Sequence, residues 1–272
     1  MGKIGIVYSK LDETGTNMTE YLARKNEFEE IEGNPPLKYR KDNISICEID
    51  VFPFEADFID SLGFDLVMFL SKHESEVGIS LFSTHSLGNW TNEARVGGKP
   101  KQLSYAAPIV MLAALTNLNL IEENVEKVYE ATHHGPLLKT PSFFVELGGN
   151  EEMRKSRENA QRVADAAYLA LTGTDKKEDG YKKVVIGIGS NHYPKKFSAL
   201  ALEKGYAFSH IMPKYAMKNN DGTGNLDMLE QVLERSIPAP ESAVIEWKSL
   251  NSSTKEETIK KLDEIGLDYE KI

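Results

Sequence analysis

Residues 142–173 read SFFVELGGNEEMRKSRENAQRVADAAYLALTG and join an apolar strand directly to an amphipathic helix. The first seven residues form a continuous apolar run, which is typical of a strand that is covered on both faces. Asn150 is suited to cap a helix, the two glutamates after it suit the positive end of the helix dipole, and Gly173 is suited to end the helix. The stretch therefore predicts a strand over 142–148 followed by a helix over 151–172, as in an α/β fold.

The rest of the chain repeats this alternation of strands and helices. Further apolar runs predict strands at 3–9, 43–50, 64–71, 125–134, 182–190, 207–212 and 243–247. Helical periodicity predicts helices at 18–30, 104–118, 196–204, 225–235 and 254–265. We therefore expect an α/β protein, built as a three-layer α/β/α sandwich with a mixed sheet.

Length and composition are those of a globular protein. The 272 residues are 40% hydrophobic and could form one large domain or two small ones. The breaks EGNPPLKYRKD at 32–42 and TGTDKKEDG at 172–180 are interpreted as loop insertions, so we expect a single domain over 1–272. Nowhere does an apolar stretch approach the roughly 20 residues that a membrane helix needs, and we expect a cytoplasmic protein.

Charge and cysteine content exclude two kinds of function. The formal net charge of −10 argues against a generally basic nucleic-acid-binding surface, although it leaves room for a local basic patch. Because Cys47 is the single cysteine, the chain can form neither an internal disulfide nor a thiolate metal cluster. Any bound metal ion must therefore be held by histidine, aspartate or glutamate.

The histidines share one placement along the chain. Each lies at or just beyond the end of an apolar run, in FLSKHESE, LFSTHSLGNW, YEATHHGP, GIGSNHYP and AFSHIMPKY. Residues just past the carboxyl ends of strands in an α/β sheet can converge on one crevice. We therefore predict a shared site among the histidines, which are His73, His85, His133, His134, His192 and His210.

Imidazole supports two roles at such a site. It can accept a proton from water near neutral pH, and it is the commonest zinc ligand in proteins. His133 and His134 would point to opposite faces of a strand, so both can bind one ion only if the chain turns there, as Gly135 and Pro136 permit. Glu146 could likewise bind a metal ion or orient an imidazole, unless it only faces solvent. A purely structural hydrogen-bonding role is the alternative for each histidine.

Two further stretches carry groups that suit phosphate or nucleotides. In GSNHYPKK a predicted strand is followed by the start of a helix, where Asn191, Lys195 and Lys196 could bind an anion. The glycines of this strand do not form the full dinucleotide-binding fingerprint. In LFSTHSLGNWTNEARVGGK an exposed indole beside cations could stack on a base, with the candidates Asn89, Trp90, Arg95 and Lys99. The alternative for the first stretch is a solvated basic turn without a ligand, and the alternative for the second is a buried tryptophan.

Three stretches together resemble the D-aminoacyl-tRNA deacylase family of archaea and plants. They are GGKPKQLSYAAP, THHGPLLKTPSFFVELGG with the following EEMRKSRENAQRVADA, and GIGSNHYPKKFSALALEKGYAFSHIMPKYAM. The resemblance runs from about residue 3 to about residue 250. It implies a core like those of peptidyl-tRNA hydrolases and nucleoside phosphorylases, and a zinc-dependent enzyme.

The resemblance further implies hydrolysis of the ester that joins a D-amino acid to tRNA. Such a reaction needs an attacking water, a stabiliser for the oxyanion and a grip on the RNA end. On this basis the catalytic candidates are His133, His134, Glu146 and Asn191. The candidate zinc ligands are His73, His85, His133, His134 and His192. The candidate substrate-binding residues are Asn89, Trp90, Arg95, Lys99, Lys195 and Lys196.

Other functions remain open from the sequence alone. The same core and the phosphate-friendly turn would suit a phosphorylase or nucleosidase, and the basic groups would suit a non-catalytic tRNA-binding module. A zinc amidohydrolase that acts on a small D-amino-acid derivative is a further alternative. The expected partner is tRNA charged with a D-amino acid, and because no obligate protein partner is evident we expect a monomer.

Overall fold

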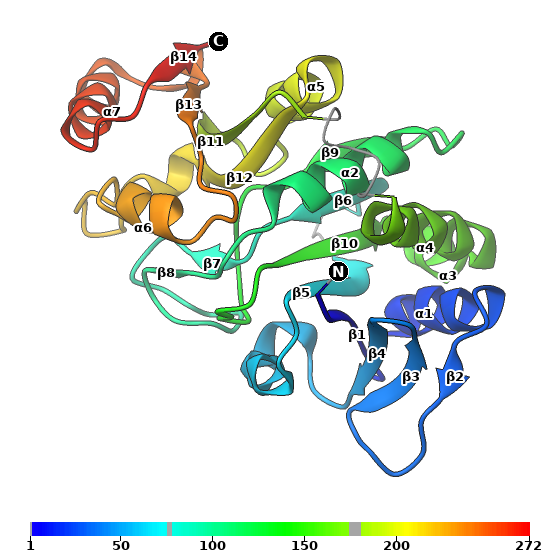
Figure 1. The fold of residues 1–272 in the computed structure, drawn as a ribbon. Helices are drawn as coiled ribbons and strands as arrows, with labels where there is room; N and C mark the ends of the chain where they lie inside the picture. Colours follow the sequence, from blue (N-terminus) through cyan, green and yellow to red (C-terminus); the bar gives the residue numbers. More distant parts are fainter. Residues whose placement is uncertain (1, 75–77, 174–180) are drawn as a thin grey trace.

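The structure is a computed structural model that describes residues 2–74, 78–173 and 181–272. The strands of its largest sheet are β1 (Ile4–Ser9), β2 (Glu29–Glu30), β3 (Leu37–Lys41), β4 (Ile44–Ile49), β5 (Leu66–His73), β6 (Leu81–His85), β9 (Glu126–Tyr129) and β10 (Ser142–Gly148). These eight strands lie in the order β2-β3-β4-β1-β5-β10-β6-β9 (Figure 1). The sheet is mixed, as expected, because β4, β1, β5 and β10 run parallel while β6 runs antiparallel to β10.

Different layers cover the two faces of this sheet. The helices α1 (Glu13–Lys25), α2 (Pro108–Asn119) and α4 (Arg157–Thr172) pack on one face (Figure 1). Short 3-10 helices at Pro53–Glu55 (η1) and Asp57–Leu62 (η2) contribute to the core on the other face. In β1 the neighbours Ile6 and Val7 point to opposite faces and both are fully buried, which explains the continuous apolar run of this strand.

A second, parallel sheet lies beside the first. It has the order β12-β11-β13-β14, formed by β11 (Lys183–Ser190), β12 (Tyr206–Pro213), β13 (Ser242–Ile245) and β14 (Tyr269–Lys271). Its part of the chain also carries α5 (Lys195–Lys204), η4 (Lys214–Ala216), α6 (Met228–Glu234), η5 (Trp247–Ser249) and α7 (Ser252–Glu264). Helix α2 contacts both β6 and β12 and so joins the two sheets, and the hairpin β7 (Gly88–Asn89) and β8 (Gln102–Leu103) lies in the long segment between β6 and α2.

Two predicted helices differ from those observed. The helix predicted at 151–172 is interrupted at Ser156, which separates α3 (Glu151–Lys155) from α4. The hydroxyl of Ser156 accepts a hydrogen bond from the backbone N–H of Asn159 at 3.2 Å and so caps α4. The first helix begins at Glu13 rather than at 18, because Asp12 caps it through a 3.0 Å hydrogen bond from the Thr14 N–H.

The strand predicted at 125–134 ends early, at Tyr129. The backbone N–H groups of Ala131 and Thr132 instead donate to carbonyl oxygens of His192 and Ile211, in and beside the second sheet. The chain thus passes from the first sheet to the second immediately before His133. This crossing brings the histidine pair to the junction of the two sheets.

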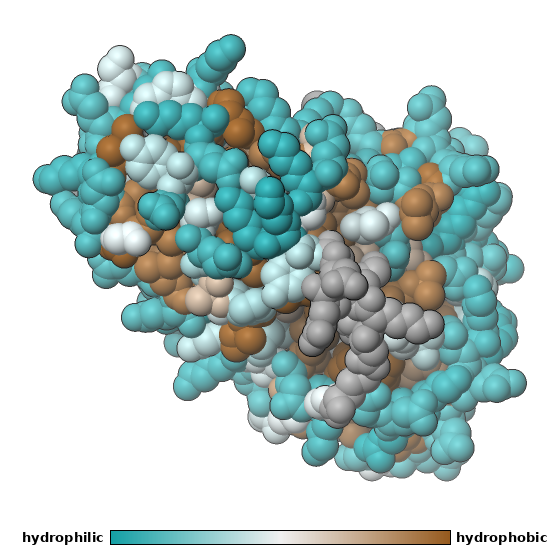
Figure 2. Space-filling model, turned by 45° about the horizontal axis from the view of Figure 1, so that its top comes forward, coloured by the Kyte–Doolittle hydropathy of each residue, from teal (hydrophilic) through white to brown (hydrophobic). Residues whose placement is uncertain are grey.

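The two expected loop insertions have different outcomes. The segment 32–42 is only partly a loop, because β3 occupies residues 37–41. In the segment 172–180, Thr172 ends α4 and Gly173 follows it, while 174–180 lie outside the described residues. Within the described part of the chain, no helix is long and apolar enough to span a bilayer. The face seen in Figure 2 is largely hydrophilic, with hydrophobic residues in smaller patches.

Candidate active site

A cleft of about 940 Å³ lies at the junction of the two sheets. Its floor includes the end of β5, the middle of β10 and the crossing segment that carries His133 and His134. The turn after β11 contributes His192. The end of β5, the middle of β10 and the segments after β9 and β11 thus supply polar side chains to one crevice, and histidines meet there as predicted.

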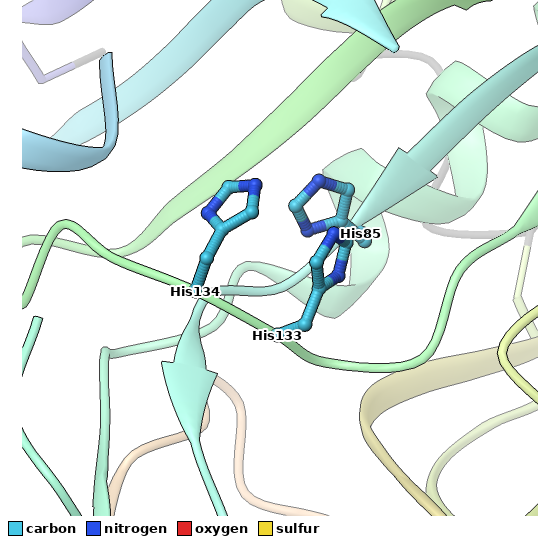
Figure 3. A group of neighbouring side chains, drawn as sticks. All are labelled: His85, His133 and His134. Carbon is cyan, nitrogen blue, oxygen red and sulfur yellow. The ribbon is translucent and has the colours of Figure 1, made fainter. Parts of the chain in front are cut away.

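His85, His133 and His134 form a compact group at this cleft. Their ring centroids lie 4.2 Å (His85 to His133), 5.0 Å (His85 to His134) and 4.3 Å (His133 to His134) apart. One nitrogen from each ring lies within 4.8 Å of the other two, and Figure 3 shows the three rings gathered together. Both members of the adjacent pair reach the group because the chain turns at His134, whose φ is +43°.

Backbone carbonyls orient the three rings. The Nδ1 atoms of His85, His133 and His134 lie 3.1, 2.8 and 2.6 Å from the carbonyl oxygens of Ser86, Ala131 and Gly135. Because a carbonyl only accepts, each Nδ1 carries a hydrogen, and in the neutral form of each ring Nε2 keeps a lone pair. The Nε2 atom of His85 is buried without a hydrogen-bond partner in the described structure. Three nitrogen lone pairs are therefore available at one point, which is the arrangement that a metal ion requires.

Burial keeps two of these imidazoles uncharged. It lowers the pKa of His133 well below its usual value and that of His134 to about 4, and the nearby His85 lowers both further. Burial alone would also lower the pKa of His85, but Glu146 outweighs it and raises that pKa. The Glu146 carboxylate lies 3.7 Å from Nε2 of His85.

Glu130 is a residue of this candidate site that the sequence prediction missed. Its buried carboxylate lies 3.0 Å from Nδ1 of His73, 2.9 Å from Nε2 of His192 and 3.9 Å from Nε2 of His133. Burial by itself would raise the pKa of Glu130, but its hydrogen bonds with His192 and His73 lower the pKa well below the usual value. The signal in the sequence is a carboxylate directly after the apolar strand, three residues before His133.

Glu146 contacts the same nitrogen of His73 as Glu130 does. It projects from β10, accepts a 2.7 Å hydrogen bond from the Ser71 hydroxyl and lies 3.1 Å from Nδ1 of His73. Burial would raise the pKa of Glu146, but the hydrogen bond with His73 and the nearby His85 lower it to about 2. Glu130 and Glu146 in turn raise the pKa of His73 to about 11 against the effect of burial. Two ionised carboxylates thus contact one imidazolium N–H.

Two tyrosines, also missed in the sequence, complete the polar part of the cleft. The hydroxyl of Tyr193 lies 2.8 Å from Nε2 of His73, and that of Tyr215 lies 3.1 Å from Nδ1 of His192. Tyr215 is 58% exposed, and a tyrosine hydroxyl keeps its proton at neutral pH. Both hydroxyls line the cleft, where each can donate or accept a hydrogen bond.

Trp90 and Asn89 have structural contacts in place of the expected substrate contacts. Trp90 is 3% exposed and its indole N–H donates to the carbonyl oxygen of Thr132 at 3.0 Å, so the expectation of an exposed stacking ring is wrong. The side-chain amide of Asn89 donates to the carbonyl oxygen of Gly97 at 2.9 Å and holds that loop. Neither residue is among those that line the cleft.

The basic candidates lie on the surface around the site. Arg95 pairs with Glu93, Lys195 with Glu126 and Lys196 with Glu246, and Lys99 is exposed. Asn191 is exposed as well and is not among the residues that line the cleft. The structure therefore does not bring Asn191 to the position that an oxyanion-stabilising group needs.

His210 does not join the other five histidines. Its Nδ1 lies 3.2 Å from the Thr132 hydroxyl and its Nε2 lies 3.1 Å from the carbonyl oxygen of Ser104. Burial lowers its pKa to about 4, so the ring is neutral and serves the core as a hydrogen-bonding group. The structural alternative considered for each histidine holds for this one.

Comparisons with known proteins point to one family. The family profile described as D-aminoacyl-tRNA deacylase matches residues 61–270. The D-aminoacyl-tRNA deacylase of Pyrococcus abyssi is 32% identical over 277 residues, which cover 97% of this chain and 98% of that protein. The one from Ignicoccus hospitalis is 35% identical over 230 residues, with 84% of this chain and 89% of that protein covered.

A solved structure shares the whole fold. It is a crystal structure described as a conserved protein of unknown function, with a TM-score of 0.87 and 29% sequence identity. The match covers 99% of this chain and 95% of that chain. The arrangement of both sheets is therefore common to the two proteins.

Proposed function

The chain belongs to the D-aminoacyl-tRNA deacylase family, and we propose that the cluster of histidines and glutamates is where it hydrolyses D-aminoacyl-tRNA. The enzyme is an ester hydrolase. Water adds to the ester carbonyl, the bond from the carbonyl carbon to the ribose oxygen breaks, and the products are the free D-amino acid and tRNA. The proposal rests on the convergence of four histidines and Glu146 on one cleft, with His85 and Glu130 buried in contact with them.

The donor set of this cleft fits a zinc ion. His85, His133 and His134 would hold it through Nε2, because their Nδ1 hydrogens are already used by carbonyl oxygens. The buried, unpartnered Nε2 of His85 supports this choice. Three histidine nitrogens with an open fourth position are typical of a catalytic zinc site. Bound zinc supplies Lewis acidity, which polarises an ester carbonyl and makes water a better nucleophile.

His192 and Glu130 are placed to handle a proton. The Glu130 carboxylate accepts a hydrogen bond from Nε2 of His192, which leaves Nδ1 beside the cleft-lining Tyr215. In our proposal this Nδ1 takes the proton of the attacking water, and Glu130 holds the ring in the required orientation. Tyr193 is the hydroxyl group that can donate to the oxyanion, because Nε2–H of the charged His73 donates to its oxygen. The single Tyr215 hydrogen must turn away from Nδ1 of His192 before that atom can take the proton.

When the aminoacyl end is bound in the cleft, the rest of the tRNA must extend outward over the rim of the cleft. Lys195, Lys196, Arg95 and Lys99 are the exposed cations that would contact its phosphates, and three of them would exchange a carboxylate partner for a phosphate. We further propose that the chain acts as a single-domain monomer in the cytoplasm, where aminoacyl-tRNA is used.

A deacylation assay with D-tyrosyl-tRNA and L-tyrosyl-tRNA tests the proposal. The wild type and His134→Ala are compared, each before and after chelation and after zinc is added back. We expect cleavage of the D ester only, loss of activity on chelation, recovery with zinc, and little activity in the variant. A D ester that survives the wild-type enzyme would refute the function, and cleavage that ignores chelation would refute the role of zinc.

A further inference from the structure

The cleft has an apolar wall next to its histidines, formed by Phe52, Phe54 and Val96. The rings of Phe52 and Phe54 stack with their centroids 5.3 Å apart. Phe54 also packs edge-on against His134, with the ring centroids 6.2 Å apart. The apolar wall therefore contacts the three-histidine group through Phe54. The hydrolysis proposed above gives this wall no role.

Much of this apolar wall is in contact with solvent. Phe52 is 41% exposed and Val96 is 43% exposed. Exposed apolar side chains that gather at a cleft mark a ligand-binding surface more often than isolated ones do. An apolar ligand group placed here would remove this surface from water, which is favourable.

Close backbone packing holds the wall in place relative to the histidines. The N–H of Gly135, which follows His134, donates to the carbonyl oxygen of Val96 at 2.9 Å. A Cβ atom at Gly97 would lie 1.8 Å from the carbonyl oxygen of Phe54, and one at Gly135 would lie 2.5 Å from the same atom. Only glycine lets these three segments lie so close together. A surface held in this way can discriminate between ligands by shape.

The cleft is polar next to His73 and His192. Tyr193 and Tyr215 line it, and their hydroxyls bond to imidazole nitrogens at 2.8 and 3.1 Å. These groups match the hydroxyls and phosphate of a nucleotide, whereas the side chains of the apolar wall offer no hydrogen bonds. An ester whose carbonyl lies at the histidines has its amino-acid side chain and its ribose on different sides of that carbonyl. The polarity of the cleft assigns the ribose to the tyrosines.

We propose that the apolar wall binds the side chain of the D-aminoacyl group and favours large apolar or aromatic side chains over small ones. This inference rests on the proposed function, because it takes an aminoacyl ester as the ligand of the cleft. The terminal adenine is the other group of the substrate that could pack on the wall, and the experiment separates the two.

The experiment measures kcat/KM for D-phenylalanyl-tRNA and for D-alanyl-tRNA. The variants are Phe52→Ala and Val96→Ala, and Phe58→Ala is the control. Phe58 lies on η2 and is 44% exposed, close to the value for Phe52, but it is not among the residues that line the cleft. Circular dichroism checks the fold, and Val96→Ala gives an independent reading if Phe52→Ala does not fold.

We expect Phe52→Ala to lower the ratio of the two kcat/KM values, phenylalanyl over alanyl, by about tenfold. Val96→Ala should lower the ratio less, and Phe58→Ala should leave it unchanged. Equal losses on both substrates would show that the wall holds the adenosine, and no loss in either wall variant would show that it binds nothing; each result overturns the inference. A wild type that cleaves neither ester would refute the proposed function instead.

Discussion

The carboxylate of Glu130 lies 2.9 Å from Nε2 of His192, although the two residues belong to segments that follow strands of different sheets. The same carboxylate lies 3.0 Å from Nδ1 of His73. Glu130 therefore connects imidazoles from both sheets at the cleft. A residue in this position orients the groups that touch the substrate.

Replacing Glu130 with glutamine should impair catalysis without removing a metal ligand of the three-histidine group. The amide cannot accept hydrogen bonds from two imidazoles as a carboxylate does, so we expect kcat/KM for D-tyrosyl-tRNA to fall about 10- to 100-fold. The matched control is Glu126→Gln, on β9, where the exposed carboxylate pairs with Lys195. Similar losses in the two variants would contradict the role of Glu130.

Zinc content should depend on His85. The buried Nε2 of His85 has no hydrogen-bond partner in the described structure, so His85→Ala removes a ligand atom that the fold leaves available. We expect metal analysis to find zinc in the purified wild type and little in the variant. His210→Gln is the control, because His210 is equally buried but bonds to Ser104 and Thr132. Zinc retained by His85→Ala would show that the ion is held elsewhere.

The sequence predicted the convergence of the histidines because strand ends are recognisable without the fold. The prediction assumed that the carboxyl ends of parallel strands share one edge. In the structure β6 runs antiparallel to β10, and His85 reaches the group because it pairs with Phe144 in the first half of β10. Glu130 was missed because it lies inside the strand predicted at 125–134. The sequence therefore did not place this carboxylate at the end of a strand. Only the bonds from Ala131 and Thr132 to the second sheet show where the strand ends.

Contacts between distant segments account for the remaining errors. The burial of Trp90 depends on the carbonyl oxygen of Thr132, 42 residues away in the chain, and no local pattern reveals that contact. The partners of the lysines at the start of α5, Glu126 and Glu246, are also distant in sequence, and the predicted phosphate contacts of these lysines stay a proposal. Propensity and spacing describe a segment well but carry little information about such pairs.

An ion pair remote from the cleft should make stability depend on pH. Burial alone would raise the pKa of Glu48, but hydrogen bonds from Lys38 and Tyr8 outweigh it, so the pKa is lower in the folded than in the unfolded chain. The pair therefore stabilises the fold above the unfolded pKa, and this contribution is lost as the pH falls through the folded pKa.

Glu48→Gln tests this dependence by urea denaturation at two pH values. At pH 7 we expect the free energy of unfolding to fall by about 1 kcal/mol relative to wild type, and near pH 3 we expect the difference to shrink. The control is Glu256→Gln, an exposed position on α7, which should change little at either pH. A difference that is the same at both pH values would rule out the charge as its cause.

Because of the close packing behind the apolar wall, substitution of Gly97 should destabilise the protein more than substitution of a glycine with the same backbone conformation in open space. Gly97 and Gly63 have φ values of +66° and +68°, but a Cβ atom at Gly97 would lie 1.8 Å from the Phe54 carbonyl oxygen while Gly63 has nothing within 4 Å. Gly63→Ala should therefore cost only the left-handed backbone strain of about 1 kcal/mol. We expect Gly97→Ala to lower the free energy of unfolding by about 2 kcal/mol more, and to reduce kcat/KM because Phe54 and the turn at Gly135 must move. Equal destabilisation of the two variants would mean that the loop at Gly97 is not packed against Phe54 as the structure has it.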